Sequence, residues 1–323
     1  MSETAQHLLE MHNLQVDFQT ARGIVHAVRD VSFHIDRGET LAILGESGSG
    51  KSVTASAILG IVDSPPGFIR AGRILFRGDD LLQMSAEQRR QLNGRAITII
   101  FQDPLAALNP VYSVGWQIAE ALRTHGLQPG NEKREALRLL ERVGIADAAR
   151  RFDSYPHQFS GGQRQRVMIA MAIATRPDLL IADEATSALD VTVQAQILTL
   201  LKELQAETGM GLLLITHNLG IVADVADRVV VMQEGRVVES GPVQPVFAAP
   251  THPYTQRLLD SVPGRHGFAV RHLAPGAIPL LEVRNLEKRY PLAAMFGAKR
   301  LANVAAVDNV SFVLHQGESR GIV

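Results

Sequence analysis

The sequence of 323 residues contains no cysteine, and that absence excludes several kinds of site. Without thiols the chain can form no disulfide, no cysteine-ligated zinc site and no thiolate-held iron–sulfur cluster. Long apolar runs are missing too, because nowhere do the roughly 18 consecutive apolar residues of a membrane-spanning helix occur. Any role at a membrane is therefore expected to be peripheral and to act through a partner.

Neither sign of charge dominates, because 32 Lys and Arg residues balance 33 Asp and Glu residues and the formal net charge is −1. Nucleic-acid-binding domains usually carry a basic surplus, so bulk charge gives no indication of a nucleic-acid partner. Hydrophobic residues make up 46% of the sequence, which is ordinary for a globular protein and enough to bury a sizeable core.

The best-defined motif is the glycine-rich stretch GESGSGKS, residues 45–52, which fits G-x-x-x-x-G-K-[ST] at every fixed position. The apolar residues 41–44 before it predict a buried strand, and helical spacing over 53–62 predicts a helix after it. In that setting backbone N–H groups and the helix N-terminus bind phosphate. Lys51 is expected to reach the β- and γ-phosphates, and Ser52 to ligate magnesium. The residues expected at the phosphates are Gly45, Glu46, Ser47, Gly48, Ser49, Gly50, Lys51, Ser52 and Val53.

Strands and helices alternate along most of the chain. Period-2 alternation or short apolar runs predict strands at 8–18, 25–35, 41–44, 179–184, 212–217 and 229–232, a strand and turn at 73–82, and a strand ending in a proline-stopped loop at 97–104. Helical spacing predicts helices at 53–62, 86–92, 159–177 and 191–208, an all-helical insert at about 104–165, and a short helical tail after 245. Such alternation indicates an α/β fold with a mostly parallel sheet.

The C-terminal part repeats the N-terminal part. Residues 280–290 match residues 8–18, and residues 306–323 match residues 27–44. Such a repeat indicates a tandem duplication, and it stops one residue before a second glycine loop would begin, so we expect no second nucleotide site. Either a fragment of a longer protein or a natural truncation would explain this. The predicted divisions are a nucleotide-binding domain at 1–250, a helical tail at 251–262, a proline- and glycine-rich linker at 263–279 and an incomplete second copy at 280–323.

Further motifs follow the glycine loop in a fixed order. SGGQ occupies residues 160–163, two carboxylates follow a buried strand at residues 183–184, and SALD occupies residues 187–190. Together with Gln102 and His217, these motifs resemble the signature, Walker B motif, D-loop, Q-loop and H-loop of the ATP-binding cassette (ABC) ATPase family. The resemblance covers about residues 8–250. It implies a P-loop NTPase of ABC type, with a mostly parallel sheet core, an antiparallel β subdomain and an all-helical insert.

The resemblance implies a role for each polar side chain of these motifs. Asp183 would hold magnesium, usually through water, and Glu184 would accept a proton from the attacking water as general base. His217 would hydrogen-bond the γ-phosphate, and Gln102 would position magnesium and water. Phe18, at the end of its strand, would stack on adenine.

The signature motif has a special consequence in this family, because it contacts the ATP bound by the other subunit. A single cassette therefore cannot assemble a full site, and a second cassette is expected as partner, either in a homodimer or in a paralogous subunit. Ser160 stands where a helix N-cap is expected, which suits it to a γ-phosphate. The residues expected to reach a nucleotide from these motifs are Ser160, Gly161, Gly162, Gln163 and Asp190.

Two further stretches, DPLAALNP at 103–110 and HPYTQRLL at 252–259, resemble the dipeptide, oligopeptide and nickel importer branch of the family. The tandem repeat resembles its fused two-cassette members, which include glutathione-importer-like ATPases. The resemblance implies an ATPase that energises import of a peptide or related small solute. Transmembrane permease subunits, and indirectly a solute-binding protein, would be its partners at the cytoplasmic face of the cell membrane. Some members carry a cysteine cluster after the tail; this chain has none.

Two other interpretations stay open. A soluble ABC ATPase acting on DNA or the ribosome would need zinc cysteines or a long coiled coil, or would lack the HPYT tail. Only 107 residues separate Ser52 from Ser160, and they show no sustained heptads. Alternatively the chain is an ATP-binding remnant that needs a second cassette for turnover, although the first copy keeps all the catalytic positions.

Overall fold

The computed structural model describes residues 7–186, 189, 191–261, 278–290 and 304–321. They fall into two compact units, residues 1–265 and 266–323. The first unit holds every motif of the predicted nucleotide site. Asp190 and two residues of the SALD stretch, 187 and 188, lie outside the described residues, as does most of the predicted linker.

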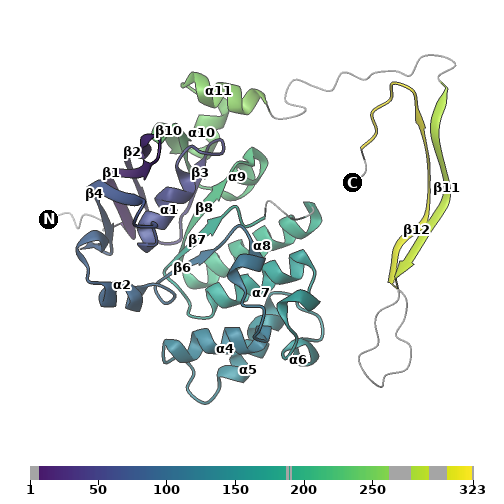
Figure 1. The fold of residues 1–323 in the computed structure, drawn as a ribbon, viewed down its shortest axis with the longest axis horizontal. Coiled ribbons are helices and arrows are strands. Elements are labelled where there is room, and N and C mark those ends of the chain that lie inside the picture. The colour runs from purple at the N-terminus through teal and green to yellow at the C-terminus, as the bar shows by residue number, and fades with distance from the viewer. Residues whose placement is uncertain (1–6, 187–188, 190, 262–277, 291–303, 322–323) are drawn as a thin grey trace. The chain divides into compact units, whose positions relative to one another are not determined.

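The first unit is built around a six-stranded sheet with the strand order β10-β9-β3-β8-β7-β6 (Figure 1). Neighbouring strands are parallel except β9 and β10, which form an antiparallel pair at one edge. The strands are β3 (Thr40–Leu44), β6 (Ile97–Ile100), β7 (Leu179–Asp183), β8 (Gly211–Thr216), β9 (Arg228–Gln233) and β10 (Arg236–Pro242). The sheet is thus mostly parallel, as the alternation of elements predicts.

The central strands are apolar over most of their length because both faces of the sheet are covered. On β8, Leu213 and Ile215 pack in a core with β1, β2 and α1, whereas Leu212 and Leu214 pack against helices on the opposite face. Successive side chains of a strand point to opposite faces, so a strand buried on both faces needs apolar residues at every position. This requirement explains the short, unbroken runs of apolar residues in the sequence.

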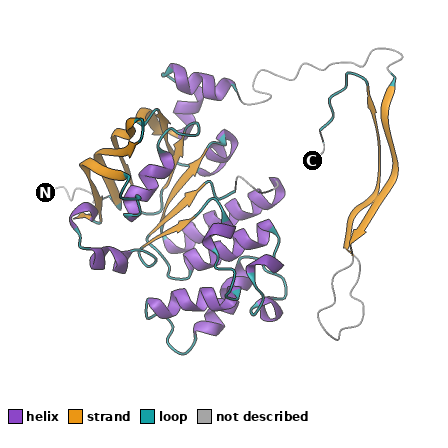
Figure 2. Cartoon of the chain, in the orientation of Figure 1, coloured by secondary structure: helices purple, strands orange, loops and turns teal. Residues whose placement is uncertain are grey.

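Helices cover both faces of this sheet (Figure 2). The helix over 191–208 forms as predicted, whereas the one expected over 53–62 begins two residues earlier and ends at Leu59, where Gly60 caps it with a left-handed φ of 68°. The helices are α1 (Lys51–Leu59), α2 (Ala86–Leu92), α3 (Pro104–Ala107), α4 (Val114–Thr124), α5 (Glu132–Arg142), α6 (Ala148–Arg151), α7 (Gly161–Ile173), α8 (Val191–Thr208), α9 (Leu219–Val225), α10 (Val243–Ala248) and α11 (Pro253–Asp260).

A smaller antiparallel sheet with the order β2-β1-β4-β5 packs on the side of α1. Its strands are β1 (Leu9–Thr20), β2 (Gly23–Ile35), β4 (Gly67–Phe76) and β5 (Asp79–Asp80). The strand and turn predicted at 73–82 are present, but the strand starts six residues earlier, at Gly67, and ends at Phe76, before the turn at 77–78. Glycine usually disfavours strands, and Gly72 lies inside β4, which explains why the sequence does not predict the early part of this strand. The structure needs glycine there because a Cβ atom would lie 2.6 Å from the Cα atom of Leu14.

The second unit is an antiparallel pair of strands, β11 (Pro279–Tyr290) and β12 (Val304–His315). It reproduces the geometry of β1 and β2, because Asn13 and Asn285 both have a left-handed φ, 51° and 47°. Each also donates its backbone N–H to a serine hydroxyl, of Ser32 or Ser311, at 2.8 Å. The repeat in the sequence thus corresponds to two strand pairs with the same register and with an irregularity at the same position, near Asn13 and Asn285.

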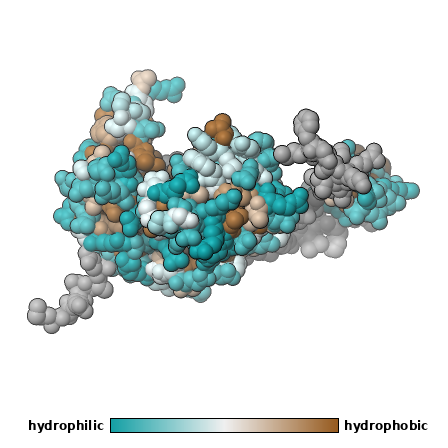
Figure 3. Space-filling view, turned by 90° about the horizontal axis from the view of Figure 1, so that it is seen from below, coloured by the Kyte–Doolittle hydropathy of each residue, from teal (hydrophilic) through white to brown (hydrophobic). Residues whose placement is uncertain are grey.

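The helices of the described part of the chain and one face of its surface bear on contact with a membrane. None of the helices there has both the length and the apolar composition needed to cross a bilayer. The face seen from below is largely hydrophilic, with small hydrophobic patches between polar side chains (Figure 3).

One buried polar side chain fixes the connection that leads from β6 to α4. The side-chain oxygen of Gln117 accepts from the N–H of Asn109, and its nitrogen donates to the carbonyls of Asn109 and Tyr112, all within 3.0 Å. Gln117 is 4% exposed, so its amide has little access to water and depends on these partners.

We expect Gln117→Leu to lower the free energy of unfolding by about 2 kcal/mol, because three backbone groups of Asn109 and Tyr112 lose the side chain that holds them in place. Urea unfolding followed by circular dichroism measures the change. Gln91→Leu on the exposed face of α2 is the matched control and should change stability by about 0.5 kcal/mol or less. Equal stabilities of the two variants would contradict this account of the connection.

Candidate nucleotide-binding site

The predicted site residues follow the carboxyl ends of neighbouring parallel strands. The glycine loop, residues 45–52, follows β3; Glu184 follows β7; and His217 follows β8. Gln102 comes two residues after β6. Carboxyl ends of parallel strands meet at one edge of a sheet, which is where ligands bind in open α/β folds. The topology therefore brings together residues that are far apart in the sequence.

The loop needs glycine at two positions for reasons visible in the structure. Gly50 has a φ of 99°, and a Cβ atom there would lie 2.5 Å from the carbonyl oxygen of Ala27. A Cβ atom on Gly45 would lie 2.3 Å from the carbonyl oxygen of Met232. Only glycine permits both the backbone conformation and the close approach of the neighbouring strands.

Lys51 is folded back into the loop. Its Nζ donates to the carbonyl oxygens of Gly45 and Glu46, both at 2.8 Å. Burial lowers the pKa of Lys51, while the carboxylates of Glu184 and Asp183 oppose that effect. The lysine is thus a desolvated cation with loop carbonyls as partners, ready to exchange them for stronger acceptors.

Two oxygen atoms meet beside the loop. The Ser52 hydroxyl donates to Oδ1 of Asp183 at 3.1 Å, so the first turn of α1 and the end of β7 face each other. Burial raises the pKa of Asp183, and the nearby charge of Glu184 raises it further, while the bond from Ser52 and the charge of Lys51 lower it. An oxygen-lined position with a poorly solvated carboxylate suits a hard divalent cation.

Glu184 is held by two neighbours. Gln102 donates its side-chain N–H to Oε2 of Glu184 at 3.0 Å, and Nδ1 of His217 lies 3.4 Å from Oε1. Glu184 also has a left-handed φ of 46°, which is uncommon for a residue with a side chain. The structure therefore brings the predicted base Glu184, the amide of Gln102 and the imidazole of His217 into contact with one another.

Most of these residues line one cleft of about 630 Å³, whereas Asp183 is not among the lining residues and is connected to the cleft by its bond to Ser52. Phe18 at the end of β1 lines the cleft as well, at the position where the sequence places an aromatic base platform. The lining residues are Phe18, Ala27, Ser47, Gly48, Gly50, Lys51, Ser52, Val53, Gln102, Glu184 and His217.

The signature residues lie outside this cleft. Ser160 is the N-cap of α7: its hydroxyl accepts from the N–H of Gln163 at 3.3 Å, and the Gln163 side chain accepts from the N–H of Ser160 at 3.1 Å. None of the described residues that line the cleft belongs to the segment 160–163. Gly162 packs against α8, where a Cβ atom would lie 3.0 Å from Val193. Of the other predicted contacts, Asp190 is not among the described residues.

Two contacts to the loop were not anticipated from the sequence. Gly235, in the turn between β9 and β10, donates its N–H to the carbonyl of Ser49 at 3.0 Å. Tyr254 of α11 accepts from the N–H of Glu46 at 3.0 Å. The sequence does not predict β10, because the turn before it has glutamate at a position where Asn or Asp is usual, although Glu234 and Gly235 both have the left-handed φ of a two-residue hairpin turn, 49° and 79°. The HPYT stretch resembles a family marker, but no local pattern in it indicates a partner so distant in the sequence.

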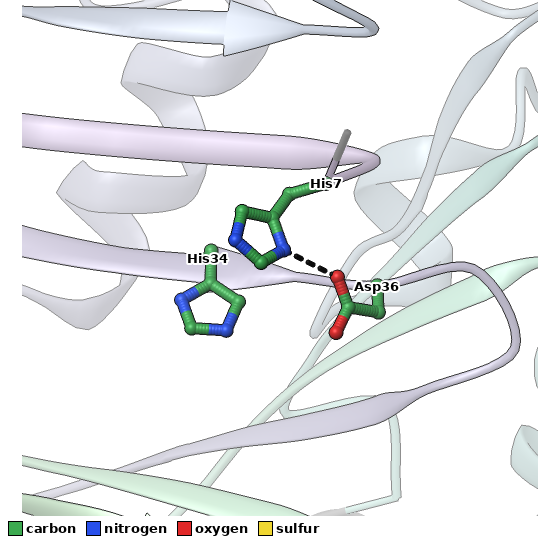
Figure 4. A group of neighbouring side chains, drawn as sticks. All are labelled: His7, His34 and Asp36. Atoms are coloured by element: carbon green, nitrogen blue, oxygen red, sulfur yellow. Dashed lines mark hydrogen bonds and ion pairs between the residues drawn. The ribbon is translucent and has the colours of Figure 1, made fainter. Parts of the chain in front are cut away.

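A group of titratable side chains on and beside β2 lies outside the cleft (Figure 4). Nδ1 of His7 is 2.5 Å from Oδ1 of Asp36, and the His7 ring lies over that of His34 with 4.0 Å between centroids. Such ligands can bind a transition metal. However, the Arg228 guanidinium lies 3.0 Å from Nε2 of His34, and burial together with this charge lowers the pKa of His34. A fixed positive charge opposes a cation, so we interpret the group as a polar network between β2 and β9.

Comparison with known proteins agrees with this geometry. The ABC transporter family model matches residues 28–187. The chain is 52% identical to the oligopeptide transport ATP-binding protein OppD of Bacillus subtilis, over 84% of this chain and 77% of that protein. It is 44% identical to the glutathione import ATP-binding protein GsiA of Salmonella typhimurium, over 99% of this chain but only 56% of that protein. The chain thus spans little more than half the length of GsiA.

The fold agrees as well. The dimeric structure of MJ0796, a bacterial ABC transporter cassette, superimposes with a TM-score of 0.66 at 25% identity, over 73% of this chain and 98% of that one. The predicted α/β fold of ABC type, with its mostly parallel core and antiparallel subdomain, is confirmed. Because the chain is more than half identical to OppD and covers more than three quarters of that protein, it belongs to the ABC transporter ATP-binding proteins.

Proposed function

We propose that this chain binds ATP with magnesium and hydrolyses ATP to ADP and phosphate, and that it thereby energises import of a peptide or a related small solute. The observation that carries the proposal is the convergence at one sheet edge of three features: a phosphate-binding loop, the pair Ser52–Asp183, and a carboxylate held between Gln102 and His217. The loop, Ser52, Gln102, Glu184 and His217 line one cleft, and Asp183 bonds to Ser52 beside it; this arrangement supports phosphoryl transfer to water.

The loop would bind the phosphates through its backbone N–H groups and through Lys51. Nucleotide phosphate is a stronger acceptor than the two carbonyls that hold Nζ at 2.8 Å, because the resulting bond is between opposite charges. Lys51 would then move its bonds from the loop to the β- and γ-phosphates. Phe18, which lines the same cleft, would stack on the adenine ring.

Magnesium fits the oxygen atoms beside the loop. Ser52 and Asp183 would hold it, and the amide oxygen of Gln102 would complete the protein's contribution, because its N–H is already bonded to Glu184. A bound magnesium ion would neutralise charge on the β- and γ-phosphates. It would also relieve the raised pKa of Asp183, because a nearby cation favours the ionised carboxylate.

Glu184 is the group placed to activate water. The water oxygen forms a bond to the γ-phosphorus while one of its protons moves to a carboxylate oxygen of Glu184, and the bond between the γ-phosphorus and the ADP oxygen breaks. Gln102 keeps the carboxylate oriented, and His217 from the end of β8 would hydrogen-bond the γ-phosphate. The proton then leaves Glu184 with the products.

A second cassette would complete the site. The N-terminus of α7, capped by Ser160 and Gln163, does not line the chain's own cleft, and it offers N–H donors and partial positive charge. We propose that it contacts the γ-phosphate of ATP bound to a partner cassette, and that Asp190 lies at the same interface. ATP held between Lys51 of one cassette and Ser160 of the other would favour the closed dimer.

The role in import rests on the relatives and on an apolar groove. OppD and GsiA are named for oligopeptide transport and glutathione import. The groove, of about 310 Å³, lies beside β6 and α7 and is lined largely by apolar side chains, among them Ile61, Phe101, Met168 and Met171. Phe101 directly precedes Gln102. A movement of the Gln102 amide at the nucleotide site would therefore be transmitted through Phe101 to a permease helix bound in this groove. We propose this groove as the permease contact, with the chain at the cytoplasmic membrane face.

Glu184→Gln should bind ATP but hydrolyse it at least about a hundredfold more slowly, because the general base is removed while the shape is kept. We expect this variant to shift from monomer to dimer in light scattering only when Mg-ATP is added. Glu87→Gln on the exposed face of α2 should behave like the wild type.

Hydrolysis of ATP by Glu184→Gln at the wild-type rate would contradict the assignment of Glu184 as general base. If Glu184→Gln binds ATP and stays monomeric, self-pairing is wrong, and another subunit or a second cassette must supply the opposing signature. The experiment thus also decides whether this chain turns ATP over by itself.

Asp183→Asn should raise the magnesium concentration needed for half-maximal hydrolysis by about tenfold or more, because an amide lacks the charge that attracts the cation. A magnesium titration at saturating ATP measures the shift. Asp178→Asn, at the opposite end of β7, is the matched control and should leave the titration unchanged. An unchanged magnesium dependence of Asp183→Asn would rule out the proposed cation position.

A further inference from the structure

Helix α11 reaches the phosphate-binding loop through one side chain, that of Tyr254. Its hydroxyl accepts a hydrogen bond from the backbone N–H of Glu46 at 3.0 Å, although 208 positions separate the two residues. Tyr254 is 3% exposed and packs in a core with Leu44, the last residue of β3, and with Val231 of β9. Burial therefore fixes the ring, and the hydroxyl has a defined place at the start of the loop.

The peptide unit that Tyr254 holds is also the one that holds the lysine. The N–H of Glu46 and the carbonyl of Gly45 belong to the same planar peptide group. The N–H donates to Tyr254, and the carbonyl accepts from Nζ of Lys51 at 2.8 Å. The hydroxyl of Tyr254 therefore sets the orientation of a peptide plane that bonds directly to the phosphate-binding lysine.

A carboxylate on β10 anchors the start of α11. Oε1 of Glu239 accepts from the N–H and the hydroxyl of Thr251 at 2.8 and 2.9 Å, and Oε2 accepts from the N–H of His252 at 3.1 Å. Burial raises the pKa of Glu239, but the hydrogen bonds outweigh it and lower the pKa to about 2. His252 in turn caps the helix by accepting from the N–H of Tyr254 at 3.2 Å.

The opposite side of the loop is supported by the turn at Gly235. Its N–H donates to the carbonyl of Ser49 at 3.0 Å, and its own carbonyl accepts from the N–H of Arg29 at 2.7 Å. This support involves no side chain. Within the described residues, Tyr254 thus provides a side chain through which α11 can change the loop.

We propose that Tyr254 is a positioning residue for ATP binding, and that the seating of α11 on the cassette is coupled to nucleotide affinity through the peptide between Gly45 and Glu46. The inference rests on the proposed function in one respect, since it takes ATP as the ligand of the cleft. Coupling of this kind is reciprocal: if seated α11 favours bound ATP, bound ATP must stabilise seated α11. A movement of the tail caused by any partner would then alter ATP binding.

Tyr254→Phe removes the hydroxyl and keeps the ring that fills the core. We expect the Kd for Mg-ATP to rise about tenfold, because the N–H of Glu46 loses its partner and the peptide plane is released. The KM should rise in parallel, while kcat at saturating ATP stays within roughly twofold, since Tyr254 touches none of the reacting atoms. Tyr112→Phe, which removes an exposed hydroxyl far from the loop, is the matched control and should bind ATP like the wild type.

Hydrogen exchange tests the reciprocal effect. Mg-ATP should slow amide exchange in residues 253–260 of the wild type by about tenfold and have little effect on this segment in Tyr254→Phe. Glu239→Gln weakens the anchor of α11 without touching the loop. Like Tyr254→Phe, it should raise the Kd for Mg-ATP, by about threefold. A purely structural role of the tyrosine would lower stability without removing the ATP-dependent protection of α11.

The outcomes separate this inference from the proposed function. If the wild-type chain fails to bind Mg-ATP, the proposed function is wrong. If the wild type binds Mg-ATP and Tyr254→Phe binds it with equal affinity, the inference is wrong and the proposed function stands. ATP-dependent protection of residues 253–260 that persists in Tyr254→Phe would also overturn the coupling.

Discussion

The structure depends on the burial of three neighbouring parallel strands, β3, β7 and β8, on both faces. Their side chains alternate between the core with the antiparallel subdomain and the cores with the helices, so the middle of each strand is apolar on both faces. Polar groups appear where the strands stop, and all three stop at the same edge. The same constraint that fixes the core therefore places the glycine loop, the two carboxylates and the histidine next to one another.

The phosphate-binding loop owes its shape to elements on several sides. The carbonyl of Ala27 on β2 leaves no room for a side chain at Gly50, the turn between β9 and β10 bonds to Ser49, and α11 bonds to Glu46. Elements from both ends of the cassette thus meet at one loop. Such a loop can be rigid enough to present its N–H groups to phosphate and still respond to movement of the C-terminal helices.

Much of this arrangement could be predicted from the sequence because it depends on local patterns. The apolar run before the glycine loop, the amphipathic helix over 191–208 and the carboxylates after 179–182 each depend on neighbouring residues. Long-range contacts leave no such local pattern. The bond between Tyr254 and Glu46 is not apparent in either stretch alone, and β10 contains Ser240, Gly241 and Pro242, which weaken a strand pattern although pairing with β9 stabilises it.

The central claim is that the edge formed by β3, β7 and β8 is one ATP site with Lys51 at its phosphates. Calorimetric titration of Mg-ATP into the wild-type chain and into Lys51→Ala tests it most directly. We predict about one ATP bound per chain in the wild type, and affinity at least about tenfold weaker in Lys51→Ala, since a buried charge-assisted bond to phosphate is lost. No binding to the wild type, or equal binding to both proteins, would contradict the account.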